Sequence, residues 1–420
     1  MLKSLGVRGF KSLADVGPIE LAPLTVVFGP NTAGKSNLID ALQVLSRLAT
    51  ANTVAEALGP PVRGLPLESF TFPQGGLPAL LARTADDPPT FRLRADLRDE
   101  EGILGYEVEI GIAPQSGALS VRDERLSQKG RSGTLVRDPD ISLDPSSRMV
   151  VVRRKRKSRE SWWEEEAGQN HTQLSNRRYS GNEYPALSRA RALLSSMRAY
   201  YLDPRVAMRA ARAPQEVDDI GPLGEDLAPF LYRLKAENPK VFASVKRSLC
   251  TVIPSVDDLS VDLDPRRGVL DVEIKQNGTA YSSRVISEGT LRVLALACVA
   301  TNPWTGSVVA FEEPENGVHP RRVELIAQLL GSLALGSKER RQVIVTTHSP
   351  LFCAAALRIA WQRPRDVRLI QVTRDEGRSR FEPFNPLGPL FQDPEIRDAL
   401  TAKDEDVWIE GLLVRGLFDG

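Results

Sequence analysis

The chain has 420 residues, of which 41% are hydrophobic and 26% are charged, so it can bury a sizeable core. This length exceeds the usual size of one core, and we expect two lobes or a domain with an inserted subdomain. The 55 basic and 54 acidic side chains leave a formal net charge of +1, which excludes a globally basic nucleic-acid-binding coat but leaves a local basic patch open.

Cysteine usage and hydropathy bound the cellular setting. Cys250, Cys298 and Cys353 are too few and too scattered for a disulfide framework or a cysteine-based zinc site. The N-terminal MLKSLGVRGFKSL lacks an apolar segment followed by a small-residue cleavage site, and no run approaches the ~18 apolar residues of a membrane span. These features predict a soluble, cytoplasmic protein with no membrane partner.

The first chemical motif follows a short apolar run, LTVVF at 24–28, which predicts a buried strand. The sequence GPNTAGKSNLIDAL comes next, in which Gly29, Gly34, Lys35 and Ser36 fit the pattern GxxxxGK[ST]. In such a loop the backbone N–H groups turn toward phosphate oxygens, the lysine reaches the β and γ phosphates, and the serine hydroxyl binds Mg²⁺. Apolar residues at 38, 42 and 45 predict the following helix, which favours a P-loop over a glycine-rich turn that only caps a helix.

The middle of the chain changes character twice. Between about residues 90 and 130, the alternating stretches FRLRADL, YEVEIGI and ALSVRDERL predict antiparallel strands. A basic block from Arg153 to Lys157 then precedes Trp162, Trp163 and three glutamates at 164–166. This pattern is typical of a solvated loop or hairpin whose opposite charges pair. The alternative is a contact with nucleic acid or a partner protein, because basic side chains neutralise phosphates and tryptophan stacks on bases.

The next segment, ALSRARALLSSMRAYYLDPRVAMRAARAP, is compatible with helix, and some of its arginines could line a basic surface beside a nucleotide site. These arginines are Arg189, Arg191, Arg198, Arg205, Arg209 and Arg212. The stretch LGEDLAPFLYRLKAENPKVFASVKRSLCTVI then predicts two helices broken at Asn238-Pro239. SVDDLSVDL and GVLDVEIKQ predict strands joined by a turn at Asp264-Pro265.

Three further motifs follow in the last third of the chain. ISEGTLRVLALACVA predicts a helix with Ser287 as N-cap and Glu288 in the first turn, where the helix dipole favours a carboxylate. SVVAFEEPENGVHP predicts a strand that ends in two glutamates and a helix-entry turn at His319-Pro320, so this histidine is interpreted as structural. RQVIVTTHSP predicts another strand, whose end presents His348. A strand, DVRLIQVTRD, follows later.

Together, GPNTAGKS, SEGT, VVAFEEPENGVHP and VIVTTHSP resemble the ATPase head shared by ABC-type proteins of the SMC, RecF and OLD groups, and most resemble compact bacterial ATPases with an EEPEnglHP signature. The resemblance covers roughly residues 1–50 and 280–355. It implies an α/β P-loop NTPase of the ABC-ATPase head type, with an antiparallel β-subdomain and an inserted helical and basic subdomain. We expect lobe I at 1–130, the insertion at 131–270, and lobe II with a C-terminal extension at 271–420.

The resemblance also implies an ATP and Mg²⁺ site that dimerisation completes. ATP would be bound by Gly29, Pro30, Asn31, Thr32, Ala33, Gly34, Lys35, Ser36 and Asn37, with Ser287 and Gly289 acting in trans from the partner. Mg²⁺ would be bound by Ser36 and Glu312, with Gln74 in TFPQGGLP as the Q-loop candidate. Lys35, Glu313 and His348 would be catalytic, with Glu313 polarising the attacking water and His348 sensing the γ-phosphate. Two features depart from the family pattern: Glu312 replaces the usual aspartate, and SEGT replaces an SGG form.

These inferences lead to one leading functional hypothesis and two alternatives. The proline-rich C-terminal segment lacks the carboxylate set of a Toprim nuclease: Asp404-Glu405-Asp406 has no preceding apolar strand, and WIEG at 408–411 only resembles the strand that opens such a domain. We therefore expect an ATP-driven switch that forms a homodimer or a higher even-numbered oligomer. It would control a separately encoded effector, such as a nuclease or toxin in bacterial anti-phage (antiviral) defence. The alternatives are a RecF-like DNA-repair ATPase, with DNA or RNA as a partner, and, as the poorest fit, a transporter ATPase subunit.

Overall fold

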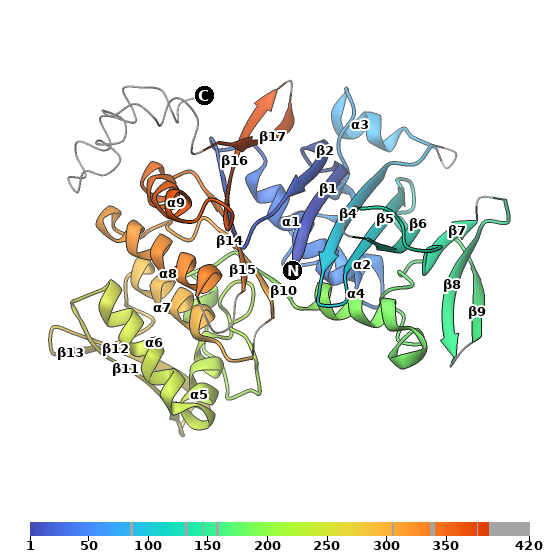
Figure 1. Cartoon of the computed structure of the whole chain (residues 1–420). Helices are drawn as coiled ribbons and strands as arrows, with labels where there is room; N and C mark the ends of the chain where they lie inside the picture. The colour runs from blue at the N-terminus through green and yellow to red at the C-terminus, as the bar shows by residue number, and fades with distance from the viewer. Residues whose placement is uncertain are drawn as a thin grey trace. The chain divides into compact units, whose positions relative to one another are not determined.

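The computed structural model describes residues 1–84, 87–130, 133–144, 146–156, 159–304, 306–336, 341–375 and 377–385 (Figure 1). Its internal contacts divide the chain into two compact units. Unit 1 contains Met1–Ala22, Thr32–Arg198 and Val372–Glu382, and unit 2 contains Pro23–Asn31, Ala199–Gln371 and the residues from Pro383 onward. The acidic triplet at 404–406 and WIEG lie outside the described residues, and the three domain boundaries expected from the sequence stay predictions.

Unit 1 is built on an eight-stranded sheet with the order β2-β1-β4-β5-β6-β7-β8-β9, and all neighbouring strands are antiparallel. The strands are β1 (Leu2–Phe10), β2 (Leu13–Glu20), β4 (Thr90–Arg98), β5 (Ile103–Ala113), β6 (Ala118–Lys129), β7 (Ile141–Asp144), β8 (Met149–Arg156) and β9 (Arg159–Glu166). Burial alternates along β4, because successive side chains of a strand point to opposite faces of the sheet. The predicted antiparallel β-subdomain and the basic hairpin are therefore confirmed.

The described residues of unit 1 form four α-helices. They are α1 (Lys35–Leu48), α2 (Val54–Ala57), α3 (Gly76–Leu81) and α4 (Pro185–Ser195), with 3-10 turns η1 (Pro66–Ser69) and η2 (Gly181–Glu183). The helix predicted after the P-loop sequence is α1, and Leu38, Leu42 and Leu45 are buried on one face. Helix α4 begins at Pro185, whose fixed φ suits the first helical position.

The second large sheet has six strands in the order β10-β14-β15-β3-β16-β17. They are β10 (Met197–Tyr200), β14 (Val308–Glu312), β15 (Gln342–Thr347), β3 (Leu24–Phe28), β16 (Val367–Asp375) and β17 (Arg378–Phe384). β14, β15, β3 and β16 are parallel to one another, and β3 and β15 are buried along their whole length. Strands buried on both faces are continuous apolar or β-branched runs, which explains why LTVVF and VIVTT show no alternation.

The rest of unit 2 is helical, with one small sheet. It contains α5 (Leu227–Glu237), α6 (Pro239–Val252), α7 (Glu288–Thr301), α8 (Val323–Leu335) and α9 (Pro350–Gln362), the sheet β11 (Val256–Asp264), β12 (Val269–Gln276) and β13 (Thr279–Ser282), and the 3-10 turns η3 (Ala207–Arg209) and η4 (Pro320–Arg322). The predicted break at Asn238-Pro239 and the predicted turn after β11 are confirmed. Among the described residues, no helix has the length and apolar content needed to cross a membrane.

One sequence expectation about local structure is wrong. In the stretch that the sequence predicts as helix-compatible, only the part up to Ser195 is α-helix: residues 197–200 form strand β10, and residues 201–212 form turns and the 3-10 helix η3. Ala199 and Tyr200 are buried, and the Tyr200 ring stacks on Phe311 of β14 with 5.1 Å between centroids. Tertiary packing against the sheet therefore overrides the weak helical pattern of this stretch.

Candidate nucleotide-binding and hydrolysis site

The loop between β3 and α1 has the close packing that a phosphate-binding loop requires. Gly34 has a φ of +104°, and a Cβ added to it would lie 2.7 Å from Ser12 Oγ and still closer to Ser379 Oγ. These two hydroxyl oxygens lie 2.8 Å apart, and Asn37 Nδ2 donates to Ser12 Oγ at 2.8 Å. Because no side chain fits at this position, glycine is required both for its conformation and for the space it leaves.

The start of α1 is arranged to favour an anion. Gly34 is its N-cap, so no side chain caps the helix, and the first turn contains no acidic residue. Just before it, Thr32 has a positive φ of +69°, and its carbonyl oxygen accepts a hydrogen bond from Arg374 Nη1 at 3.1 Å. An uncapped helix N-terminus without a competing carboxylate attracts phosphate through its dipole and its free N–H groups. This part of unit 1 therefore fits the phosphate groups of ATP.

A buried ion cluster on α1 was not identified from the sequence. Asp40 is fully buried, and its Oδ2 lies 2.6 Å from Lys11 Nζ and 3.0 Å from Arg63 Nη2. Lys11 Nζ also donates to the carbonyl oxygen of Arg63 at 2.8 Å. The cluster connects α1 with the β1–β2 turn and with the segment that follows α2. It therefore anchors the helix that begins at the P-loop.

In unit 2, the acidic strand end lies at the same sheet edge as the beginning of the P-loop. Glu312 is paired with Thr346 of β15 in the parallel register, and Thr346 is paired in turn with Val27 of β3. Because parallel strands end at one edge, Gly29 and Glu313 leave the sheet there, on the two sides of β15. Ligand sites of open α/β sheets form at such an edge.

Glu313 is held in an uncommon backbone conformation by a set of hydrogen bonds. Its φ is +43°, its N–H donates to the Thr346 carbonyl at 2.9 Å, and its own carbonyl accepts the Asn316 N–H at 3.1 Å. Its side chain accepts a hydrogen bond from Asn316 Nδ2 at 2.7 Å, and its Oε1 lies 3.0 Å from His348 Nδ1. Left-handed conformations of residues other than glycine cost about 1–3 kcal/mol and cluster at functional sites. The backbone and both partners fix the direction of this carboxylate.

Two buried oxygens near this edge have no hydrogen-bond partner within the described part of the chain. They are Glu315 Oε2 and Thr346 Oγ1. The other carboxylate oxygen of Glu315 accepts a hydrogen bond from the Thr347 hydroxyl, and burial raises the pKa of Glu315. Thr346 and Thr347 are fully buried, so of the side chains at the end of β15 it is His348 that is exposed. Unpaired buried oxygens are uncommon and mark a place where water or a cation can bind.

The donor atoms fit Mg²⁺ held together with phosphates. Ser36 and Glu312 offer hard oxygen ligands of the kind that Mg²⁺ prefers. No group of three or more His, Cys, Asp or Glu side chains in the described ranges is arranged to hold a metal. Mg²⁺ is commonly bound by one or two protein oxygens, with substrate phosphates and water completing the octahedron. Ser36 lies in unit 1 and Glu312 in unit 2, so their joint binding of a nucleotide-bound magnesium ion stays a prediction.

The SEGT turn packs against the turn that follows Glu313. Ser287 is the N-cap of α7, as predicted, and its Oγ accepts the Thr290 N–H at 3.2 Å. A Cβ added to Gly289 would lie 2.5 Å from the carbonyl oxygen of Gly317. Glu288 lies in the first turn, and its Oε1 accepts a hydrogen bond from Arg205 Nε at 2.8 Å. The glycine of SEGT is therefore also needed to bring these two turns of unit 2 into contact.

The arginines of the 189–212 stretch have internal partners, which argues against the basic surface considered from the sequence. In unit 1, Arg189 pairs with Asp99 at 2.5 Å, and Arg191 donates to three backbone carbonyls. In unit 2, Arg209 donates to the carbonyl of Ile286 at 2.6 Å, directly before Ser287. Arg205 and Arg209 thus fix the SEGT turn.

The remaining sequence candidates differ in how the structure places them. His319 is the N-cap of η4 and its Nδ1 accepts the Arg321 N–H at 3.3 Å, which confirms its structural interpretation. Gln74 is exposed in a turn before α3. Its role at a magnesium ion stays a prediction.

Sequence reasoning missed the residues that orient the candidate catalytic carboxylate. Asn316, Glu315 and Thr347 lie within four residues of Glu313 or His348, and each contributes a hydrogen bond at this edge. The signal was present in EEPEN, where a third carboxylate and an amide follow the glutamate pair. Their role as hydrogen-bond partners at this sheet edge becomes evident only in the structure, where the positive φ of Glu313 turns the chain back toward the end of β15.

A P-loop that leaves the central parallel strand, with an acidic strand end at the same edge and a separate antiparallel sheet, defines an ABC-type ATPase head of the P-loop NTPase class. Residues 24–354 match the family model described as "AAA domain, putative AbiEii toxin, Type IV TA system". The match covers most of the chain, so the chain belongs to this family, and it is an ATPase head of the SMC and OLD type.

Individual relatives agree with this family. The chain is 22% identical to an OLD nuclease from Thermus scotoductus over an alignment of 444 residues, which covers 100% of this chain and 72% of that nuclease. A segment of 73 residues is 41% identical to the chromosome partition protein Smc of Desulfitobacterium hafniense and spans 17% of this chain but 5% of Smc.

A solved structure shows the fold alone. The Smc head domain derived from Pyrococcus furiosus, with an extended coiled coil and bound to the C-terminal domain of ScpA, matches with a TM-score of 0.52. The match has 14% identity and covers 94% of this chain and 99% of that chain.

Proposed function

We propose that the chain is a Mg²⁺-dependent ATP hydrolase that works as a molecular switch and dimerises head to head. The observation that carries this proposal is the Glu313–His348 pair, 3.0 Å apart, at the sheet edge where the P-loop begins. A carboxylate with a fixed direction and an adjacent imidazole can orient an attacking water and respond to the γ-phosphate.

Each residue has a role in this proposal. Bound ATP with Mg²⁺ supplies the phosphoryl group and neutralises part of its charge. Lys35 and the P-loop N–H groups hold the phosphates, while Ser36 and Glu312 provide oxygen ligands for the metal. Glu313 accepts a hydrogen bond from the attacking water, and Asn316 keeps its second carboxylate oxygen engaged, so that the first keeps its direction. Positioning and charge stabilisation supply most of the catalysis in phosphoryl transfer.

The proposal places Ser287 and Gly289 against the γ-phosphate bound by the partner subunit. The Ser287 hydroxyl need not be free for this, because the N-terminus of α7 itself presents N–H groups to an anion. The contact between Gly289 and the turn after Glu313 supports communication between the two halves of the dimer. Nucleotide binding at one P-loop would shift the SEGT turn of the other subunit. Because that turn contacts Gly317, the shift would change the position of Glu313 in the same subunit.

A mixing experiment tests the trans arrangement. Lys35→Ala and Ser287→Arg each remove ATP turnover when present in both subunits. In a mixed dimer, one site keeps both an intact P-loop and an intact SEGT turn, so an equal mixture should recover about a quarter of wild-type turnover: half of the dimers are mixed, and each has one working site. A mixture that is no more active than its two components contradicts the trans role.

The effector is proposed to be a separate protein. The family description names a toxin of a Type IV toxin–antitoxin system, and the relative from Thermus scotoductus is named a nuclease of which this chain spans 72%. These names support an ATP-controlled effector in antiviral defence. Pull-down of the full chain with the product of its adjacent gene, with and without ATP, should recover a complex whose stability depends on the nucleotide. Equal recovery in both conditions, or no complex, contradicts effector control by ATP.

A further inference from the structure

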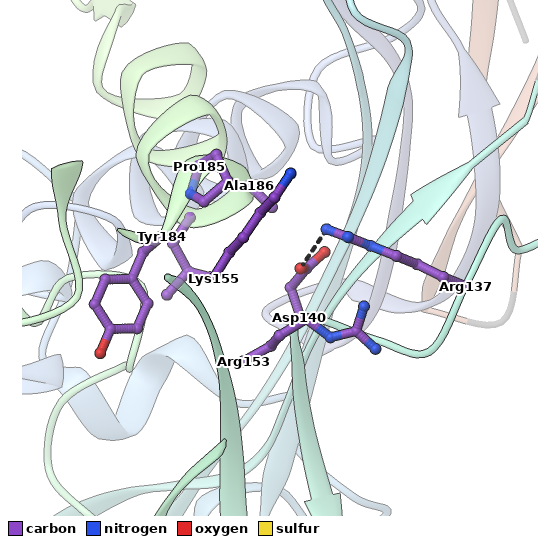
Figure 2. A pocket seen from close by; sticks show the side chains of 8 residues that line it. Arg137, Asp140, Arg153, Lys155, Tyr184, Pro185 and Ala186 are labelled. Atoms are coloured by element: carbon purple, nitrogen blue, oxygen red, sulfur yellow. Dashed lines mark hydrogen bonds and ion pairs between the residues drawn. The ribbon is translucent and has the colours of Figure 1, made fainter. Parts of the chain in front are cut away.

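A narrow crevice in unit 1 lies between strand β8 and the start of helix α4, and none of the residues that line it is assigned to ATP (Figure 2). Its lining is basic, with one acidic side chain, and consists of Arg137, Asp140, Arg153, Lys155, Tyr184, Pro185, Ala186 and Leu187. No water-sized space remains between its walls, so a ligand would bind at its mouth. None of the roles derived above uses these residues.

Arg153 is the unusual side chain of this crevice. Only 6% of it is exposed, yet no hydrogen bond from its guanidinium is found among the described residues, and its buried Nε has no partner. Its ion pairs with Glu160 and Asp138 have N to O distances of 3.6 Å and 3.8 Å, which are too long for hydrogen bonds. Buried polar groups are normally hydrogen-bonded, so this arginine has donors to spare for a ligand.

The side chains that line the crevice include more cations than carboxylates. Arg137 donates to the buried Asp140 at 2.9 Å, whereas Lys155 is exposed and makes no ion pair with a residue that the structure describes, although Glu160 lies opposite it in the β8–β9 register. Figure 2 shows these basic side chains around Asp140, with the beginning of α4 as the opposite wall. Three cations and one buried carboxylate line the crevice, and Arg137 is also paired with Glu160 at 3.6 Å. Glu160 and Asp138 lie outside the lining, are 46% and 87% exposed, and offset part of this positive charge.

The helix wall adds a second attraction. Tyr184 is the N-cap of the eleven-residue α4, no side chain caps the helix, and its first turn has no acidic residue. The residues that line the crevice, 185–187, are its first turn. The positive end of the helix dipole therefore lies beside Arg153 and Lys155, and it favours a phosphate-like anion.

An exposed tryptophan adjoins this anion site. Trp162 of β9 is directly paired with Arg153 of β8, so both side chains lie on the same face of the hairpin. The Arg153 guanidinium lies 4.6 Å from the centre of the Trp162 ring, and 44% of the tryptophan is exposed. The exposed ring can stack on a base, and the crevice can attract a backbone phosphate. Together they match the two parts of a nucleotide within a strand.

We propose that this face of the β8–β9 hairpin binds single-stranded nucleic acid, with a backbone phosphate at the mouth of the crevice and a neighbouring base stacked on Trp162. The proposal goes beyond the ATP switch, and it can fail or hold independently of it.

The opposite face of the same hairpin provides a matched control. It carries Arg154 and Trp163, but Arg154 is held by Glu183 at 2.6 Å. Arg178, which lies over Trp163, pairs with Glu165 at 3.5 Å. Arg154 is therefore hydrogen-bonded where Arg153 is not, while Arg178 is paired about as closely as Arg153.

The test is fluorescence anisotropy of the full chain with a labelled oligothymidylate of about 16 nucleotides, a length typical of single-strand sites. We expect Lys155→Gln to lower the slope of log affinity against log salt by about 0.7, the value for one phosphate contact with a single strand. Trp162→Ala should weaken binding about tenfold, as loss of one stacked base does. Arg154→Gln and Trp163→Ala should change neither quantity, and thermal midpoints of all variants verify folding.

Three results would overturn the proposal. One is equal loss of binding in the Lys155 and Arg154 variants, which would indicate non-specific charge attraction. Another is the absence of oligonucleotide binding at low salt. If inorganic phosphate then still raises the thermal midpoint of wild type but not of the Lys155 variant, the site binds a free phosphate compound instead of a strand. The third is an unchanged affinity of Trp162→Ala together with the lowered salt slope of Lys155→Gln, which would show that no base stacks on Trp162.

Discussion

Glu124 gives a prediction whose size follows directly from the structure. This carboxylate is buried on β6, where it accepts hydrogen bonds from Tyr106 Oη at 3.0 Å and from the N–H groups of Gln173 and Leu174 at 2.6 Å and 3.0 Å. Burial outweighs these hydrogen bonds and raises its pKa from 4.5 to about 7. The folded chain therefore holds this proton more tightly than the unfolded chain does.

The consequence for stability has a definite sign and pH window. Because the folded-state pKa is raised, the contribution of Glu124 is fully present below pH ~4.5 and is lost as pH rises to about 7. A shift of about 2.5 units at ~1.4 kcal/mol each gives a loss of about 3 kcal/mol over this window. Glu124→Gln removes the titrating group. The free energy of unfolding of wild type minus that of the variant should therefore fall by about this amount as pH rises from ~4.5 to ~7, and stay level above pH ~7.

The assay is urea unfolding of the full chain at pH values between 5 and 8, followed by tryptophan fluorescence, to which Trp162 and Trp163 of unit 1 contribute. Comparing the two proteins at each pH cancels the titration of all other groups. A difference that is constant with pH, or that grows in favour of wild type as pH rises, would refute the reasoning, since it would mean that the hydrogen bonds outweigh burial.

Three further predictions concern the nucleotide site and its support. Gly34→Ala should abolish ATP binding measured with a fluorescent analogue, because its Cβ would meet Ser12 and Ser379, whereas Gly117→Ala, at a positive φ in open space, should leave binding intact. Asn316→Ala should lower the kcat of ATP hydrolysis about 10- to 100-fold at unchanged nucleotide affinity, as expected for a lost hydrogen bond to a charged group, and an unchanged kcat would contradict its positioning role. Asp40→Asn should reduce the free energy of unfolding by about 3 kcal/mol, because it leaves Lys11 and Arg63 without their buried partner; Asp87→Asn, at an exposed pair, should change it by less than about 0.5 kcal/mol.

Much of the fold was predictable where local signals are strong. The P-loop strand and helix, the break at Asn238-Pro239, the N-cap at Ser287 and the strand end at Glu312 all follow from turn chemistry and hydrophobic runs over a few residues. The strand β10 was not predictable, because its four residues are selected by packing of Tyr200 on Phe311, which lies more than a hundred residues away in the sequence. Short segments of this kind take their structure from their neighbours.

The site was predictable in its motifs but not in its supports. The residue types at Lys35, Glu313 and His348 are recognisable from spacing. The positive φ of Glu313, the hydrogen bond from Asn316 and the unpaired oxygen of Glu315 depend on how one turn folds, and no spacing rule encodes them. The same applies to Arg153: its sequence context suggested a paired surface charge, while its nearly complete burial without hydrogen bonds became evident only in three dimensions.

Steady-state ATP hydrolysis and nucleotide binding by Glu313→Gln test the central claim most directly. Glu324→Gln is the matched control, since it makes the same chemical change at a partly exposed carboxylate on α8. If Glu313 orients the attacking water, Glu313→Gln should bind ATP as tightly as wild type and accumulate as an ATP-dependent dimer. Its turnover should fall by at least about a hundredfold, in the range seen when a positioned general base is removed. Turnover within about twofold of both wild type and Glu324→Gln would contradict the assignment.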